Sequence, residues 1–186
     1  MHLILLRHTR PMLSSDICYG NLDIDLIADY AADFEQTLAG LPSFDRIISS
    51  PLRRCRLLAA HIAGQTGRAL VFEPDLTEMD FGAWQGRPWD DIAIAEIDEW
   101  AADFEHGRPH GGESVAQLRA RLQSMLQRFL LAQVSVDERV LVVTHAGVIR
   151  ALAAMVAGDC NGGDERNIQI GYGEIIALNT SDLQVL

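Results

Sequence analysis

The chain has 186 residues, of which 48% are hydrophobic and 22% charged, and this composition is typical of a folded globular protein rather than a disordered or collagen-like one. Fifteen basic and 26 acidic side chains give a formal net charge of −11 at pH 7. Because nucleic acids and anionic membranes are bound by basic surfaces, this balance argues against both as partners. A small anionic substrate remains compatible, since a few arginines can create a local positive field.

The first residues and the cysteines indicate where the protein works. The apolar residues 1–6 run directly into Arg7 and His8, which makes them too short for a signal-peptide core or a membrane-spanning helix. The three cysteines are widely spaced and form no Cys-x-x-Cys pair, so the sequence predicts neither a disulfide framework nor a cysteine zinc site. We therefore expect a buried first strand and a reducing, cytoplasmic location.

Short apolar runs alternate with longer amphipathic ones along the chain. Strands are predicted in the short runs, at residues 2–6, 45–48, 69–72, 140–144 and 174–178. Helices are predicted in the amphipathic stretches, at residues 26–41, 51–66, 113–133 and 147–156. Most of the strands are continuous Val/Ile/Leu runs of the kind that is covered on both faces. The alternation predicts an α/β fold, a three-layer α/β/α sandwich with a mainly parallel central sheet.

Residues 79–112 interrupt this alternation. They contain all three tryptophans, Trp84, Trp89 and Trp100, together with several glycines and prolines. We expect a small helical cap inserted beside the sheet, within one domain that spans residues 1–186. Tryptophans in such a segment more often anchor a core than stack on a substrate, so these are expected mainly in the packing of the cap.

Polar side chains follow the predicted strands at their carboxyl ends, the edge where ligands collect in parallel sheets. Arg7 and His8 follow the first strand, and His145 follows the strand that ends at residue 144. Two imidazoles beside guanidinium groups form a poor metal site, because arginine repels cations and no third ligand stands at zinc spacing. They suit a phosphate, which arginine binds through paired hydrogen bonds while a neutral imidazole nitrogen attacks phosphorus. An ordinary buried histidine is the alternative for each residue taken alone.

Ser50 and Pro51 predict a helix start, with serine as the N-cap and proline at the first helical position. Arg53 and Arg54 then fall in the first turn, where basic side chains oppose the helix dipole. Their placement is favourable if arginine and free backbone N–H groups hold an anion together. From this segment alone, two solvated arginines explain the pattern equally well.

A phosphate ester leaves as an alkoxide that needs a proton, so an acid is expected near the bridging oxygen. Glu78, after the loop that leaves the third strand, is the first candidate, and Asp80 competes with it. Glu113 is a weaker candidate. A solvated surface group is the alternative for each.

Five segments occur in the order found in the histidine phosphatase superfamily, also called phosphoglycerate mutase-like: LLRHT (5–9), SSPLRRC (49–55), LTEMDFG (76–82), GES (112–114) and THAG (144–147). The chain resembles this superfamily over most of its length. The segment ICYGNLD (17–23) and the short chain most resemble the adenosylcobalamin/α-ribazole phosphatase branch.

The resemblance implies a role for each catalytic position. His8 is expected to be the nucleophile that becomes phosphohistidine, Glu78 the general acid and then base, and His145 a group that stabilises the charge of the transferring phosphoryl group. Arg7 and Arg54 are expected to hold that group. Arg54 is favoured over its neighbour Arg53 because it immediately precedes a position where the family has a small residue.

Further substrate contacts are implied at Tyr19, Gly20 and Ser14, the last of which stands where the family commonly has asparagine. Thr9 and Ala146 stand where the family usually has glycine, and these departures remove no catalytic group. The resemblance implies no metal and no organic cofactor.

The expected substrate is a small phosphate ester. Residues 90–105 carry seven acidic and no basic side chains, which does not favour the second anionic group of phosphoglycerate. We therefore expect a phosphomonoesterase with a neutral, ring-bearing leaving group such as that of α-ribazole 5′-phosphate, in a protein compatible with a homodimer. Phosphoglycerate mutase-type transfer and a catalytically idle binding or regulatory module are the alternatives. A nucleotide-dependent kinase or dehydrogenase is disfavoured, because the chain has neither glycine-rich nucleotide motif.

Overall fold

The computed structural model describes residues 2–131, 137–158 and 168–179. Its centre is a five-stranded sheet in the order β4-β3-β6-β1-β7. The strands are β1 (His2–Arg7), β3 (Arg46–Ser49), β4 (Leu70–Phe72), β6 (Arg139–Thr144) and β7 (Ile175–Asn179). The first four in this spatial order run parallel to one another, and β7 pairs antiparallel with β1. The prediction of a mainly parallel sheet is therefore confirmed.

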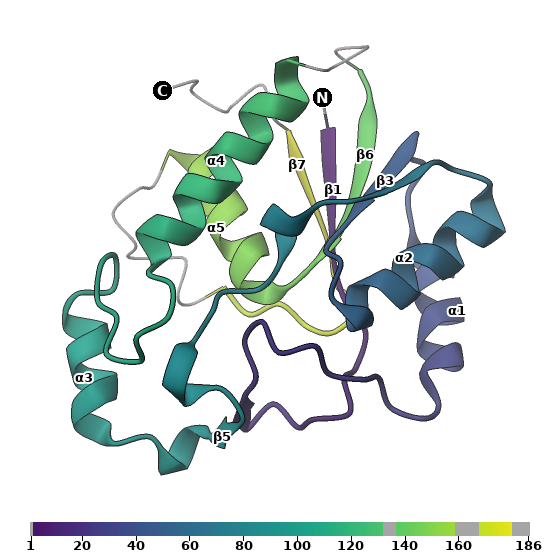
Figure 1. The fold of residues 1–186 in the computed structure, drawn as a ribbon. Coiled ribbons are helices and arrows are strands. Elements are labelled where there is room, and N and C mark those ends of the chain that lie inside the picture. The colour runs from purple at the N-terminus through teal and green to yellow at the C-terminus, as the bar shows by residue number, and fades with distance from the viewer. Residues whose placement is uncertain (1, 132–136, 159–167, 180–186) are drawn as a thin grey trace.

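Helices cover both faces of the sheet (Figure 1). One face packs against α1 (Tyr30–Gly40) and α2 (Arg53–Thr66), and the other against α4 (Val115–Leu131) and α5 (Ala146–Ala157). Side chains of β1 alternate between two core clusters, Leu3 and Leu5 in one and Ile4 and Leu6 in the other. Because successive strand residues point to opposite faces, this alternation requires a core on each side, and the three-layer architecture is confirmed.

Two helix starts differ from the prediction. The segment expected to begin α1 at residue 26 is extended, because Leu26 is buried in a bridge with Pro11. The expected N-cap of α2 at Ser50 is also wrong, since the helix begins at Arg53 after an extended Leu52. The Ser50 hydroxyl accepts a bond from the Leu52 N–H at 3.3 Å and contacts His145. The end of the helix expected at 113–133 lies outside the described residues.

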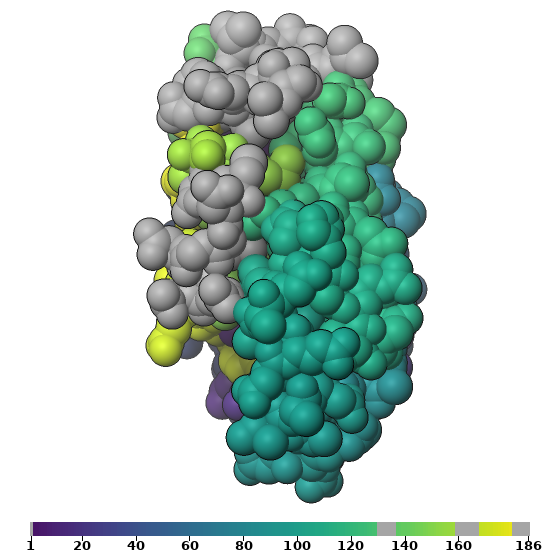
Figure 2. Space-filling view, turned by 90° about the vertical axis from the view of Figure 1, so that its left-hand side faces the viewer, coloured from purple at the N-terminus to yellow at the C-terminus, as the bar shows by residue number. Residues whose placement is uncertain are grey.

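Residues 79–112, the predicted insertion, connect the short 3-10 turn η1 (Pro74–Leu76) to α4. It contains 3-10 turns, one helix and a strand that pairs with β2 (Ile17–Cys18). These elements are η2 (Gly82–Trp84), β5 (Arg87–Pro88), η3 (Trp89–Asp91) and α3 (Ile94–Ala102). The insertion lies beyond one end of the sheet (Figure 1), and with α4 it forms one continuous surface (Figure 2).

The three tryptophans of the insertion pack against one another. The Trp84 ring lies 6.3 Å from that of Trp89 and 5.9 Å from that of Trp100, and Trp84 is fully buried. Its indole N–H donates to Glu96, which satisfies the buried donor. Trp84 is thus a core anchor, as expected, whereas the other two also line a cavity. None of the helices within the described ranges is both long and apolar enough to cross a membrane.

Candidate active site

The ends of β1 and β6 bring two histidines together. His8 and His145 each follow the carboxyl end of a parallel strand, and their ring centroids lie 5.2 Å apart. Both side chains are buried. Because β1 and β6 are adjacent and in parallel register, their last residues reach the same edge of the sheet.

His8 is held in one tautomer by the backbone carbonyl of the next residue, Thr9. Its Nδ1 lies 2.7 Å from the carbonyl oxygen of Thr9, which can only accept, so Nδ1 carries the proton. Burial, followed by the positive charge of Arg54, lowers the pKa of His8 well below its ordinary value. The ring is therefore neutral at pH 7, and Nε2 keeps the lone pair that a nucleophile needs.

His145 is neutral for similar reasons. Burial, followed by the positive charge of Arg54, lowers its pKa well below the ordinary value. Its Nε2 lies 2.9 Å from the Ser50 hydroxyl and 3.4 Å from the sulfur of Cys55. Burial raises the pKa of the Cys55 thiol, so this cysteine packs beside the imidazole in its protonated form.

Arg53 and Arg54 have opposite environments. Arg54 is fully buried, and its guanidinium donates to the carbonyl oxygens of Gly20 at 2.7 Å and Leu22 at 2.6 Å. Arg53 points outward and pairs with Asp25 at 2.5 Å on the surface. The structure therefore places Arg54, and not Arg53, beside the histidines.

The guanidinium groups of Arg7 and Arg54 each have a hydrogen-bond donor that the described residues do not use. Within the part of the chain that the structure describes, the buried Nε–H of each guanidinium has no hydrogen-bond partner. A buried cation with unused donors is costly unless an anion completes its bonds. The fork of donors on arginine matches the oxygens of a phosphate, so these two residues fit an oxyanion placed beside His8.

The three candidate acids, Glu78, Asp80 and Glu113, have different environments in the structure. Glu78 lines a cavity next to Arg7, and its carboxylate accepts the N–H groups of Gly147 at 3.1 Å and Met79 at 2.9 Å. Asp80 does not line that cavity. Its side chain accepts the Gly82 N–H at 2.8 Å and so shapes the turn.

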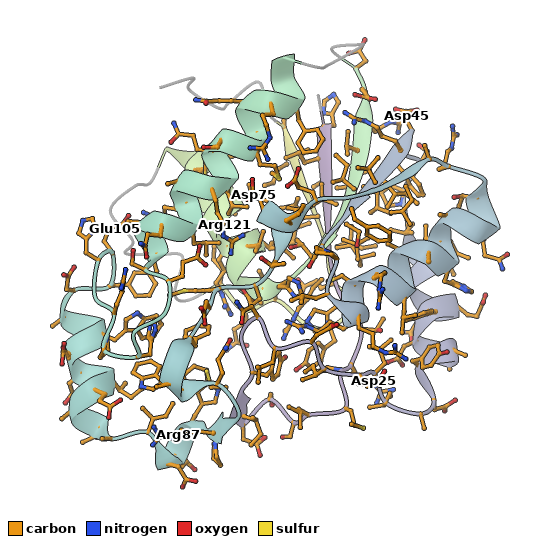
Figure 3. The ribbon with its side chains drawn as sticks, viewed as in Figure 1. Asp25, Asp45, Asp75, Arg87, Glu105 and Arg121 are labelled. Atoms are coloured by element: carbon orange, nitrogen blue, oxygen red, sulfur yellow. The ribbon has the colours of Figure 1, made fainter. Side chains whose placement is uncertain are left out.

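Glu113 forms an ion pair with Arg121 of α4, a residue that no sequence pattern singled out. Nε and Nη2 of Arg121 donate to the two Glu113 oxygens at 2.7 and 3.0 Å. Arg121 also donates to the backbone carbonyls of Asp75 and Thr77, which precede Glu78 in the same loop. Figure 3 shows Arg121 pointing from α4 toward the segment that carries Asp75. The pair thus anchors the loop of the candidate acid.

The cavity has a volume of about 490 Å³ and opens between the sheet edge, the insertion and helices α4 and α5. Its charged end contains Arg7 and Glu78, and the rest of its wall is mostly apolar and aromatic, including Phe81, Trp89, Trp100 and Phe104. Tyr172, in the turn before β7, also lines it. Tyr172 was not predicted from the sequence, because it precedes a strand and lies outside the segments that carry the family resemblance.

Of the three remaining predicted contacts, two line the cavity and one does not. Tyr19 and Gly20 line it, and Gly20 has a positive φ of 41° that favours glycine. Ser14 is not among the lining residues; it is exposed and donates to Asp16, and its neighbour Ser15 lines the cavity instead.

No cluster of three or more His, Cys, Asp or Glu side chains with the placement of metal ligands occurs in the described ranges.

A sequence model of the histidine phosphatase superfamily (branch 1) matches residues 3–184. The chain belongs to this superfamily. The expectation that it resembles the adenosylcobalamin/α-ribazole phosphatase branch is also supported by its relatives.

The relatives of this chain have several different activities. The adenosylcobalamin/α-ribazole phosphatase of Escherichia coli is 28% identical over 165 residues, which cover 85% of this chain and 80% of that protein. A 2,3-bisphosphoglycerate-dependent phosphoglycerate mutase of Methylorubrum populi is 33% identical over 62% of this chain and 57% of its own. The mycobacterial glucosyl-3-phosphoglycerate phosphatase structure has a TM-score of 0.79 at 25% identity, covering 95% of this chain and 88% of its own.

Proposed function

We propose that the protein is a phosphomonoesterase that works through a phosphohistidine on His8. The observation that carries this proposal is a neutral, buried imidazole whose Nε2 lone pair is free, adjacent to Arg7 and under the charge of Arg54. An unprotonated nitrogen beside two cations is suited to attack a phosphorus atom whose oxygens those cations neutralise.

In the first step, Nε2 of His8 bonds to phosphorus and the bond from phosphorus to the ester oxygen breaks. Arg7 and Arg54 stabilise the charge on the transferring phosphoryl group, because their donors are already oriented and desolvated. Glu78, entering protonated, gives its proton to the departing oxygen. His145, neutral and 5.2 Å from His8 between ring centroids, can donate a hydrogen bond to a phosphoryl oxygen.

In the second step, the ionised Glu78 removes a proton from a water molecule, and the resulting oxygen attacks phosphorus. The bond from phosphorus to His8 breaks, inorganic phosphate leaves, and Glu78 is protonated again. No oxidant, reductant or cofactor is needed for either step. The N–H of Gly147, at 3.1 Å, stabilises the carboxylate that exists between the two steps.

The wall of the cavity supports a substrate with a neutral, ring-bearing leaving group. Trp89, Trp100 and Phe104 offer faces and edges on which a flat ring can pack. α-Ribazole 5′-phosphate has such a leaving group, and an α-ribazole phosphatase is among the relatives. It is the substrate we propose to test first.

Phosphoglycerate mutase-type transfer is the second candidate, and one residue favours it. Arg150 of α5 lines the cavity, and besides Arg7 it is the only basic side chain among the described lining residues. A phosphoglycerate carboxylate would need such a partner. The Arg150 Nε–H donates to the Ile168 carbonyl at 2.7 Å, an interaction that uses part of its donor set.

Rapid quenching with a ³²P-labelled substrate tests the proposal. We expect an acid-labile, base-stable label in the wild-type protein and none in His8→Ala. Steady-state assays with α-ribazole 5′-phosphate, p-nitrophenyl phosphate and 3-phosphoglycerate then separate a monoesterase from a mutase. A label on Cys55 or on a serine would contradict the mechanism, and the absence of turnover with every ester would favour an idle binding module.

A further inference from the structure

Two tyrosines connect the two arginines of the candidate phosphate site. The Tyr172 ring lies under the guanidinium of Arg7, with 3.9 Å between Cζ and the ring centroid. The corresponding distance from Arg54 to the Tyr19 ring is 5.3 Å. The two hydroxyl oxygens are 3.1 Å apart and share a hydrogen bond. A continuous series of contacts thus runs from one guanidinium to the other.

The turn that carries Tyr172 is fixed to the end of β1. Arg7 donates from its side chain to the Ile170 carbonyl and from its backbone to the Glu174 carbonyl at 3.1 Å. The Gly173 N–H lies 3.2 Å from the Arg7 carbonyl oxygen and 3.3 Å from that of His8. Tyr172 is therefore held against Arg7 by its backbone as well as by its ring.

The contacts with the tyrosine rings offset the electrostatic repulsion between the guanidinium groups of Arg7 and Arg54. The guanidinium groups of Arg54, which is buried, and Arg7, which is partly buried, repel each other when no anion lies between them. An aromatic face beside a guanidinium attracts it through the ring quadrupole and restricts its orientation. Burial raises the pKa of Tyr19, so its hydroxyl stays protonated at neutral pH and can share the bond with Tyr172.

We propose that Tyr172 is a positioning residue of the phosphoryl-binding site, which acts with Tyr19 to hold Arg7 and Arg54 in the orientation that binds an oxyanion. This inference rests on the proposed function, which assigns the two arginines to phosphate. It adds a residue from the turn before β7 to a site whose two histidines follow the parallel strands β1 and β6. Tyr172 also contacts His8, with 5.7 Å between ring centroids, so it restricts the nucleophile as well.

Orthovanadate is a suitable probe, because it mimics the transferring phosphoryl group and its binding needs no turnover. Tyr172→Leu removes both the ring and the hydroxyl, and we expect it to weaken vanadate binding roughly tenfold or more in titration calorimetry. Tyr172→Phe and Tyr19→Phe keep the rings and break only the shared hydrogen bond. Each should weaken vanadate binding by roughly threefold.

The double variant Tyr19→Phe/Tyr172→Phe gives the decisive comparison. Since the two hydroxyls share one bond, the double variant should bind vanadate about as weakly as either single variant. A general structural defect would not produce this coupling. Tyr30 is the remaining tyrosine and packs on Phe34 in α1, so Tyr30→Phe is the matched control and should bind vanadate like the wild type.

Three outcomes would overturn the inference: Tyr172→Leu binding within twofold of wild type, single effects that multiply in the double variant, or a wild-type protein that does not bind vanadate. If Tyr172→Leu fails to fold, as judged by circular dichroism, the phenylalanine cycle still decides. Failure of the proposed function is a separate result. In that case the wild type hydrolyses no phosphate ester, while the vanadate titrations still judge the tyrosine pair.

Discussion

The N–H of Gly147 donates to the Glu78 carboxylate at 3.1 Å, and that carboxylate lies where a side chain at residue 147 would begin. A Cβ added at residue 147 would collide with the Glu78 carboxylate. Glycine is favoured here by the close approach of the Glu78 carboxylate and not by its own backbone, which is an ordinary part of α5 with no positive φ. The N-terminus of a helix thus holds the candidate acid through direct backbone contact.

Gly147→Ala should displace the Glu78 carboxylate and slow hydrolysis of alkyl phosphates by about 10²-fold, the lower range for loss of a positioned acid. The measurement is kcat/KM with an alkyl phosphate. Gly64→Ala in α2 is the matched control, because nothing lies within 4 Å of the added Cβ. This control should retain activity and gain up to about 1 kcal/mol in stability. Full activity in Gly147→Ala would show that the contact is dispensable.

Glu78→Gln should reveal proton donation through its dependence on the leaving group. An alkoxide needs a proton to depart, whereas p-nitrophenolate is a weak base that leaves unassisted. We expect the rate of phosphoenzyme formation to fall by about 10²–10⁴-fold for an alkyl phosphate and only slightly for p-nitrophenyl phosphate. Asp80→Asn is the control and should show no such dependence. The reverse pattern would assign the acid to Asp80.

Arg54→Lys keeps the charge but loses the planar fork and the two bonds to the carbonyl oxygens of Gly20 and Leu22. We expect a loss of roughly 2–4 kcal/mol of transition-state stabilisation, measured as a decrease in kcat/KM. Arg53→Lys should cost much less, because Arg53 forms a surface pair with Asp25. Equal losses in the two variants would contradict the orientation of Arg54 toward the site.

The two buried histidines make stability depend on pH. Their pKa values in the folded protein lie well below the ordinary value of about 6.5, mainly because of burial. As the pH falls through that value the unfolded chain takes up protons first, so the free energy of unfolding should decrease on acidification. Each histidine contributes up to about 1.4 kcal/mol per pH unit.

Urea unfolding of the wild type and of His8→Gln at pH 7.5 and 5.5 measures this effect. The variant lacks one buried imidazole and should lose less stability between the two pH values. Indistinguishable losses would mean that His8 is protonated equally in the folded and unfolded states.

Phosphatase activity should survive exhaustive treatment with EDTA. The groups beside His8 are the guanidinium groups of Arg7 and Arg54 and the imidazole of His145. The positive charge of the two arginines repels a divalent cation. The assay is hydrolysis of p-nitrophenyl phosphate before and after chelation. Loss of activity that Mg²⁺ or Zn²⁺ restores would overturn the proposed mechanism.

The amino-acid sequence by itself determined the edge at which the site forms. Continuous apolar runs predict parallel strands, and the carboxyl ends of parallel strands share one edge, so Arg7, His8 and His145 had to converge. The five ordered segments predicted the superfamily through their resemblance to it, and two of them contain Arg7, His8 and His145 at the strand ends. These features depend on local sequence and on a rule of topology that holds for the whole sheet.

Other features were decided only by the tertiary structure. The resemblance already favoured Arg54 and Glu78, but the burial of Arg54 and the exposure of Arg53 depend on which side of α2 faces the sheet, and the contact of Glu78 with the amide of Gly147 depends on the approach of α5. Tyr172 reaches the site because β7 runs antiparallel to β1, so the turn before that strand, rather than the one after it, lies at the active edge. Strand direction and the approach of distant backbone atoms are set by long-range packing, which no local pattern encodes.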